Sequence, residues 1–105
     1  MQQTEDKNCH DCGVNRTLKV IGSKWTAMIL HNIFEGQNRF GQLQRSLAGI
    51  SPKTLSLRLK ELEEEGIISK KVFAEVPLHV EYNLTSKGKS LEDIFDTMAA
   101  WGRKY

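Results

Sequence analysis

The sequence predicts a mainly α-helical domain with one small β-hairpin, and two patterns carry this prediction. Apolar residues recur at helical spacing through residues 14–62 and again after Thr85. The intervening segments 67–73 and 80–84 are instead rich in β-branched and aromatic residues, as strands are. A length of 105 residues is enough for one domain with one core, and too short for two.

The first two expected helices lead to a turn. A short helix ends at Gly22, because three apolar residues before it share one face: Val14, Leu18 and Ile21. Residues 24–34 form a second helix, which is apolar enough to be the central buried one: Trp25, Met28, Ile29, Leu30 and Ile33. Residues 35–38, E-G-Q-N, have the composition of a turn.

The next two helices are joined by a tight connection. Arg39 opens a short helix with an apolar face of Phe40, Leu43 and Leu47. Ser51 is then an N-cap candidate, Pro52 suits the first helical position, and Gly66 can end the helix. One face of this helix is apolar: Leu55, Leu59 and Leu62. The opposite face carries short polar and cationic groups, namely Lys53, Ser56, Leu57 and Lys60, with Thr54 and Arg58 on its flank.

The remaining segments are a hairpin, a last helix and an N-terminal arm. Residues 74–79, which include Pro77, form the loop between the two strands. Thr85 is the next N-cap candidate, and the last helix runs to about Trp101. Residues 1–11 are polar and are expected to be a flexible arm, so that residues 12–105 form the domain. Two short helices joined by a Gly-containing turn and followed by a hairpin predict a winged helix-turn-helix.

Composition and missing motifs exclude several functions. The net charge is only +2, so any contact with nucleic acid requires a local basic patch. The N-terminus lacks the apolar run of a signal peptide, and the longest apolar run, residues 27–30, is far too short to span a bilayer. We therefore expect a cytoplasmic protein without a membrane partner. The sequence has no G-x-S-x-G, phosphate-binding glycine loop or H-E-x-x-H, and predicts neither an enzyme nor a cofactor.

A series of short motifs occurs in order along the chain. These are I-G-S-K-W at 21–25, R-F at 39–40, I-S-P-K-T-L at 50–55, R-L-K-E-L-E at 58–63 and V-E-Y-N-L-T at 80–85. Single residues complete the series: Cys12, Leu18, Leu43, Gly66, Gly88, Leu91, Trp101 and Gly102. At these spacings, nearly the whole folded part resembles the HxlR-type winged-helix transcriptional regulators of bacteria.

The resemblance implies a DNA-binding homodimer that regulates a nearby gene, commonly as a repressor. In some members of the family the cysteine at the position of Cys12 responds to oxidants or electrophiles. This sequence departs from the family pattern at two positions. His79 precedes V-E-Y where an arginine is usual, so wing contact with the DNA backbone is expected to be weaker or pH-dependent. Ser23 stands where a second glycine is common, a small change that we expect to be tolerated.

The helix that starts at Ser51 is the expected DNA-reading element. Major-groove readout needs short donors and acceptors near a helix N-terminus, and the candidates are Ser51, Pro52, Lys53, Thr54, Ser56 and Leu57. Leu57 could contact a thymine methyl group. Other side chains are better placed for phosphate: Arg39, Arg45, Arg58, Lys60, Lys70, Lys71 and, on the wing, His79. The alternative is that these are solvated surface charges.

The last helix carries an apolar stripe: Leu91, Ile94, Phe95, Met98 and Trp101. A two-fold dimer interface with the first helix of a partner would bury it, and would present two reading helices to a pseudo-palindromic operator on double-stranded DNA. The alternative is that the stripe packs against the protein's own first two helices.

Cys9 and Cys12 form a C-x-x-C pair near the N-terminus. A structural zinc needs four ligands, and the sequence offers no second pair, so no metal is predicted. In the cytoplasm both cysteines are expected to be reduced at rest. We favour a redox pair, in which the helix start promotes a thiolate at Cys12 that attacks an oxidant or electrophile. Cys12 could form a sulfenic acid, a disulfide with Cys9 or a disulfide with Cys12 of a second subunit, and two unreactive thiols are the alternative.

The sequence therefore predicts a DNA-binding transcriptional regulator. The alternative function is a winged-helix module that binds another protein and leaves the polar-faced helix free of DNA. Binding to duplex DNA separates the two hypotheses.

Overall fold

The computed structural model describes residues 12–105, and the predicted arm at residues 1–11 lies outside the described residues. The described part contains these elements in chain order: α2 (Gly13–Ile21), α3 (Lys24–Phe34), α4 (Phe40–Ser46), α5 (Pro52–Glu64), β1 (Ile68–Phe73), β2 (His79–Leu84), α6 (Ser86–Lys89) and α7 (Glu92–Lys104). Its helices are all too short or too polar to span a bilayer. The predicted winged helix-turn-helix is confirmed.

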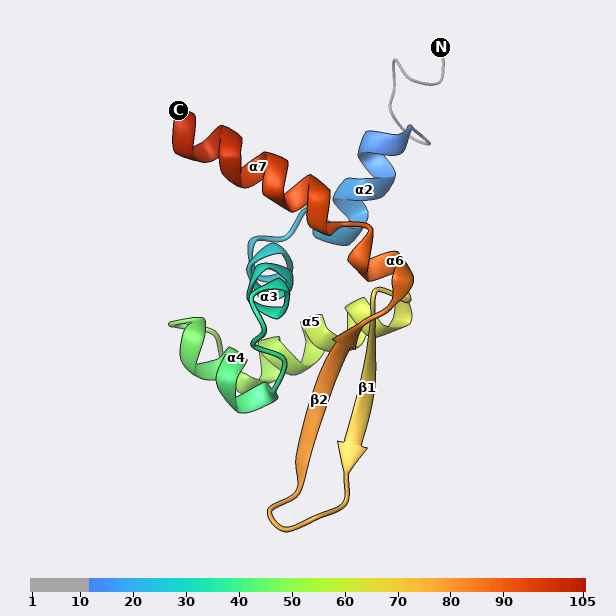
Figure 1. Cartoon of the computed structure of the whole chain (residues 1–105), viewed down its shortest axis with the longest axis vertical. Coiled ribbons are helices and arrows are strands. Elements are labelled where there is room, and N and C mark those ends of the chain that lie inside the picture. Colours follow the sequence, from blue (N-terminus) through green and yellow to red (C-terminus); the bar gives the residue numbers. More distant parts are fainter. Residues whose placement is uncertain (1–11) are drawn as a thin grey trace.

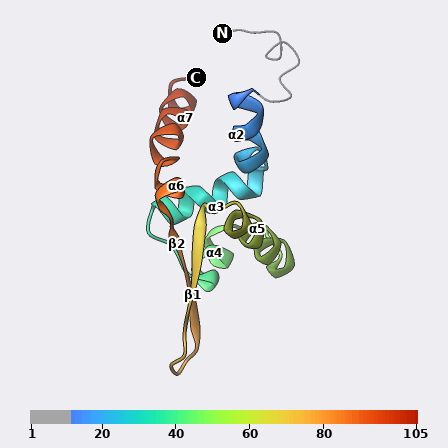
Figure 2. The same cartoon turned by 90° about the vertical axis from the view of Figure 1, so that its right-hand side faces the viewer.

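The elements are arranged around α3 (Figure 1). Helices α4 and α5 lie on one side of α3, and the β-hairpin projects away from them at one end of the molecule. Helices α2 and α7 extend from the opposite end, as the turned view in Figure 2 also shows. The parts expected to contact DNA are thus separated from the parts expected to contact a partner.

The core lies where α3, α4 and α5 meet the root of the hairpin. Its fully buried side chains are aliphatic: Ile29, Leu30, Leu43, Leu55, Leu59, Leu62, Ile67 and Ile68. The leucine face predicted for α5 is therefore the buried one, and α3 is the central helix. Met28, which the sequence places beside the register of Trp25, Ile29 and Ile33, is 41% exposed.

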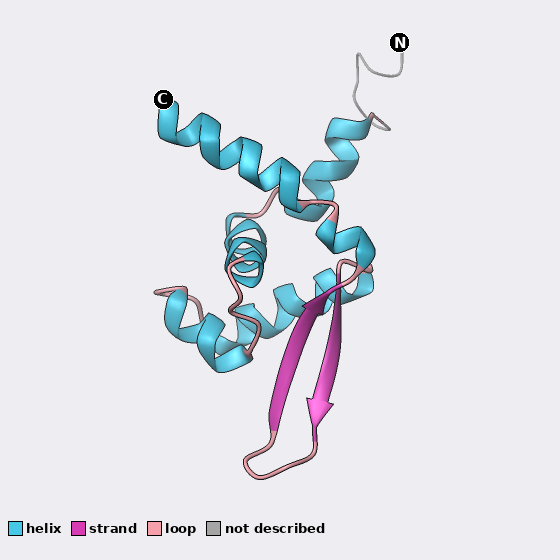
Figure 3. Ribbon diagram, viewed as in Figure 1, coloured by secondary structure: helices cyan, strands magenta, loops and turns pink. Residues whose placement is uncertain are grey.

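The hairpin is antiparallel, and its register pairs Ile68 with Leu84 and Phe73 with His79. Each strand begins one residue away from its predicted start. The chain before α4 adds a short third pairing, in which the Tyr82 N–H donates to the Asn38 carbonyl at 2.8 Å. A bridge between Arg39 and Glu81 extends this pairing. The wing is thereby tied to the start of α4 (Figure 3).

The predicted last helix is in fact two helices, α6 and α7. The Thr85 hydroxyl caps α6 by accepting from the Gly88 N–H at 3.1 Å, and it also donates to the Ile67 carbonyl at 3.0 Å. Gly88 lies so close to the Ile67 carbonyl that a Cβ there would collide with its oxygen. This close contact holds α6 against the hairpin root, and the chain turns at Leu91 before α7 continues past Trp101 to Lys104.

The two faces of α5 allow a matched stability test. Leu59→Ala removes a fully buried side chain and should lower the free energy of unfolding by about 2–5 kcal/mol. Leu57→Ala, on the same helix but half exposed, should change it by about 0.5 kcal/mol or less. Urea denaturation followed by circular dichroism, at one protomer concentration, measures both values. Equal losses in the two variants would contradict this packing.

Candidate nucleic-acid interface

The N-terminal turn of α5 is preorganised by its own sequence. Ser51 has extended backbone angles, and its Oγ accepts from the Thr54 N–H at 3.1 Å, so it is the N-cap that was predicted. Pro52 occupies the first turn, where its missing N–H costs no helical hydrogen bond. At the other end, Gly66 has a φ of +74°, a conformation that favours glycine. The caps and the buried leucines hold this helix in one orientation.

The outer face of α5 presents the predicted mixture of groups. The side chains of Ser51, Lys53, Ser56, Leu57 and Lys60 are exposed, and Thr54 is half buried. No carboxylate stands among them, since the acidic residues of this helix begin at Glu61. A helix face of this kind can offer hydroxyl and ammonium donors to base edges and phosphates.

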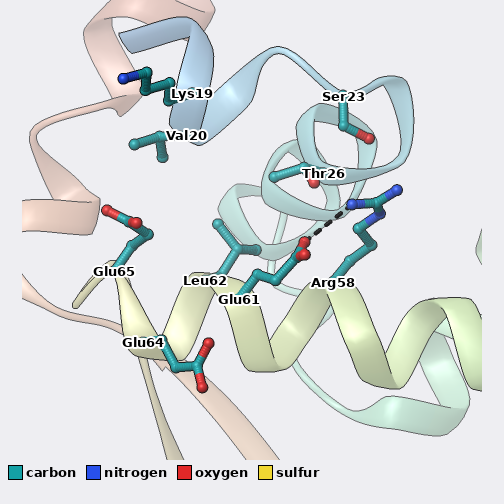
Figure 4. A pocket seen from close by; sticks show the side chains of 9 residues that line it. All are labelled: Lys19, Val20, Ser23, Thr26, Arg58, Glu61, Leu62, Glu64 and Glu65. Atoms are coloured by element: carbon teal, nitrogen blue, oxygen red, sulfur yellow. Dashed lines mark hydrogen bonds and ion pairs between the residues drawn. The ribbon is translucent and has the colours of Figure 1, made fainter. Parts of the chain in front are cut away.

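Arg58 lies apart from this exposed face. Its side chain enters a cavity of about 270 Å³ that Ser23 and Thr26 also line, as Figure 4 shows. The Nη1 atom lies 3.0 Å from Oε1 of Glu61. Its Nε atom is buried without a hydrogen-bond partner within residues 12–105. Arg58, predicted as a phosphate contact, thus fills the space between α5 and the start of α3.

The wing carries two exposed cations, Lys70 and Lys71. Because adjacent strand residues point to opposite faces, the two lysines leave the hairpin on different sides. Lys71 stands opposite Glu81 in the register, and its Nζ lies 5.0 Å from the centre of the Phe73 ring. Both cations lie on β1, between the wing tip and the body of the domain.

His79, the predicted wing contact, is packed among neighbouring side chains of the hairpin. Its ring stacks on Phe73 with centroids 4.5 Å apart. Its two nitrogens lie 3.3 Å from a Glu75 oxygen and 3.5 Å from a Glu81 oxygen. Glu81 also lies 3.7 Å from Nη2 of Arg39. The imidazole is therefore held inside a cluster of wing side chains, with only 20% of its surface exposed.

The wing tip is apolar. Val76 is fully exposed and Leu78 is 65% exposed, and residues 74–78 include no cation. At the wing root, burial and then the negative charge of Glu63 raise the pKa of the Tyr82 phenol above its usual 10.0. The phenol is therefore neutral at physiological pH. The cations of this half of the molecule are on α5, β1 and α4, not on the tip.

Cys12 is the N-cap of α2, and its Sγ accepts from the Asn15 N–H at 3.4 Å. Cys12 is disulfide-bonded in this structure. Cys9 lies outside the described residues. The predicted position of Cys12 at a helix start is confirmed.

The predicted apolar stripe of the last helix is partly buried and partly exposed. Phe95 is buried, and its ring packs edge-on against Phe34 at 5.2 Å, so it belongs to the protomer's own core. Leu91 is half buried, whereas Ile94, Met98 and Trp101 are exposed. On α2, the apolar residues Val14 and Leu18 are exposed as well.

Local sequence pattern did not indicate the contacts between the wing and the start of α4. The Asn38 carbonyl accepts from Tyr82, and Asn38 Nδ2 donates to Asn83 Oδ1 at 3.3 Å. These residues were assigned to a turn and a strand, and no spacing rule connects them. Only the folded chain shows that they join the wing to the helix pair.

Comparisons with known proteins agree with this geometry. The model of the HxlR-like helix-turn-helix family matches residues 20–105. YdeP of Bacillus subtilis (strain 168), an uncharacterized HTH-type transcriptional regulator, is 39% identical over 94 residues, which cover 90% of this chain and 73% of that protein. YtcD of the same strain, also an uncharacterized HTH-type transcriptional regulator, is 40% identical over 100 residues, which cover 95% of this chain and 79% of that protein.

Solved structures are similar over most of the chain. The redox regulator HypR in its reduced form has a TM-score of 0.83 and 39% identity, with coverage of 89% of this chain and 92% of that chain. The reduced form of the transcriptional regulator YodB from B. subtilis has a TM-score of 0.77 and 35% identity, with coverage of 90% and 93%. A diamide-treated YodB structure has a TM-score of 0.73 and 34% identity, with coverage of 91% and 96%.

Three findings lead to one conclusion. They are a capped helix with an exposed polar face, a hairpin tied to its helix pair, and a family match over most of the chain. This protein belongs to the HxlR-like helix-turn-helix family and is a DNA-binding transcriptional regulator.

Proposed function

We propose that this regulator binds a pseudo-palindromic operator as a homodimer, represses the gene beside it, and changes its affinity for DNA when Cys12 is oxidised. The observation that carries the DNA-binding proposal is the outer face of α5. Lys53, Ser56 and Leu57 are exposed beside the capped first turn, and the opposite face of the helix is buried. In the major groove these side chains would reach base edges.

Phosphate contacts would flank this helix. Lys60 lies further along the same exposed face, and Lys70 and Lys71 lie on the wing. Arg39 is half exposed at the start of α4, beside the wing. Because the whole chain carries a net charge of only +2, affinity would come from this local group of cations.

The homodimer proposal rests on α2 and α7. Both helices leave apolar side chains exposed, and their charges are complementary. Helix α2 has Arg16 and Lys19 and no carboxylate, whereas α7 begins with Glu92 and Asp93. An α2 helix packed on the partner's α7 would bury the apolar residues and pair opposite charges. Two-fold symmetry would then place the two α5 helices about 34 Å apart, one turn of DNA.

The redox proposal rests on Cys12. A sulfur at a helix N-cap is close to backbone N–H donors, which favour the thiolate form. Two thiols would form a disulfide by giving two electrons and two protons to an oxidant, and the partner thiol is Cys9 or Cys12 of the second subunit. HypR, a similar protein, has been solved in both reduced and oxidised forms.

The DNA-binding proposal is tested with duplex DNA from upstream of the protein's own gene, by fluorescence anisotropy at several salt concentrations. Wild type should bind specifically and weaken steeply as salt rises. Lys53→Ala with Lys60→Ala should abolish specific binding, and each lost phosphate contact should reduce the log–log salt slope by about one. Lys89→Ala with Lys104→Ala, on α6 and α7, is the matched control and should bind as wild type does.

A folded wild-type dimer that binds no DNA at any salt concentration would refute the proposal, and would favour the winged-helix protein-interaction module.

The dimer is tested by charge insertion on α7. Met98→Glu places a carboxylate on the exposed apolar side and should shift the protein to monomers in sedimentation equilibrium. Ala100→Glu adds the same charge two residues along, where a helix points to its other side, and should leave the dimer intact. A monomeric wild type, or equal effects of the two substitutions, would refute this interface.

The redox proposal is tested by treating reduced protein with diamide or a quinone and measuring operator affinity. Wild type should change its affinity, and Cys12→Ser should not. The Cys9→Ser variant distinguishes between the two possible disulfide partners of Cys12, because it blocks a disulfide within one subunit and permits one between the two Cys12 residues. Equal responses of wild type and Cys12→Ser would remove Cys12 from the mechanism.

A further inference from the structure

The His79 imidazole lies between two carboxylates of the wing. Its Nδ1 lies 3.3 Å from Oε1 of Glu75, and its Nε2 lies 3.5 Å from Oε2 of Glu81. A neutral imidazole has a proton on only one ring nitrogen, so the other nitrogen would present a lone pair to a carboxylate oxygen. Both contacts are favourable only when the ring is protonated. The arrangement of this cluster therefore matches an imidazolium.

Glu81 joins this histidine to the start of α4. The same carboxylate oxygen, Oε2, lies 3.7 Å from Nη2 of Arg39, whose side chain is half exposed. Arg39 and Glu81 also form a backbone bridge, so the two residues stay side by side. An imidazolium at His79 would share this carboxylate with Arg39 and weaken the attraction between Glu81 and the guanidinium. Protonation of the histidine thus acts on a cation that is proposed to contact phosphate.

Other charged groups face the histidine from β1 and α4. Lys71 on β1 has its ammonium over the Phe73 ring, on which His79 stacks. A cavity of about 420 Å³ lies between α4 and the wing, and Arg39, Arg45 and His79 are among the residues that line it. Within the described part of the chain, no carboxylate lines this cavity. A third cation there would increase its attraction for a DNA phosphate.

We propose that the wing is a proton-sensitive element, in which protonation of His79 strengthens DNA binding. Residues 68–84 contain two lysines and two glutamates, so the net charge of the wing is zero when the histidine is neutral. One proton makes this charge +1 and loosens Arg39 from Glu81. Histidine side chains change charge between pH 5 and 8, so the affinity for DNA rises as the pH falls through this range. The proposal rests on the proposed operator binding and adds a control of it.

The test uses the duplex from upstream of the protein's own gene, with affinity measured by fluorescence anisotropy at pH 5.5 and 7.5, at constant ionic strength and with a reductant. Wild type should bind about three- to tenfold more tightly at the lower pH, because each protomer takes up a proton. His79→Gln should remove this gain. His79→Arg, which is always charged, should bind tightly at both pH values. His31→Gln changes an exposed histidine on α3, and this matched control should keep the gain.

A second measurement needs no DNA. NMR spectra of the free protein between pH 5 and 8 follow the His79 ring and the backbone amides of the wing loop, which should shift together because Glu75 lies in this loop. The proposal is overturned if His79→Gln keeps the wild-type pH response, or if the loop amides shift independently of the ring. Absence of duplex binding by wild type at both pH values would instead refute operator binding, and the NMR titration would then decide whether the cluster responds to protons.

Discussion

The burial of the leucine face of α5 against α3 is the contact on which the rest of the structure depends. Leu55, Leu59 and Leu62 are almost completely excluded from solvent, together with Ile29 and Leu30. This contact leaves one orientation for α5, so its polar residues must face outward. The N-cap at one end and Gly66 at the other limit the helix to the segment that the leucines anchor. A DNA-reading face is thus a consequence of core packing.

The wing extends the same core in a different way. Ile67 and Ile68 are buried at its root, and the Asn38–Tyr82 hydrogen bond joins it to the chain before α4. The close approach of Gly88 to Ile67 then directs the chain from the wing into α6. Because the hairpin root contacts α4 and α6, it links the helix pair to the segment that leads into α7.

The distribution of charge gives this regulator a particular surface. The wing tip is apolar and its histidine is enclosed by two carboxylates, whereas cations lie on α5 and β1. The other half of the molecule is also divided, with a basic α2 and an acidic start of α7. Although the net charge is low, the molecule has two separate basic regions, one on the DNA-reading side and one on α2.

The sequence by itself determined the order of the elements, their approximate ends and the buried face of α5, because periodicity, caps and glycines act over a few residues. It also indicated the family through ordered motifs. Tertiary structure alone decided that Arg58 turns into a cavity, that His79 meets Glu75 and Glu81, and that Phe95 joins the core. It also divided the last helix at the contact of Gly88 with Ile67. Most of these contacts join residues from different elements. Glu75 is close to His79 in the sequence, but the fold of the wing decides whether the two side chains meet. No local pattern could therefore reveal these contacts.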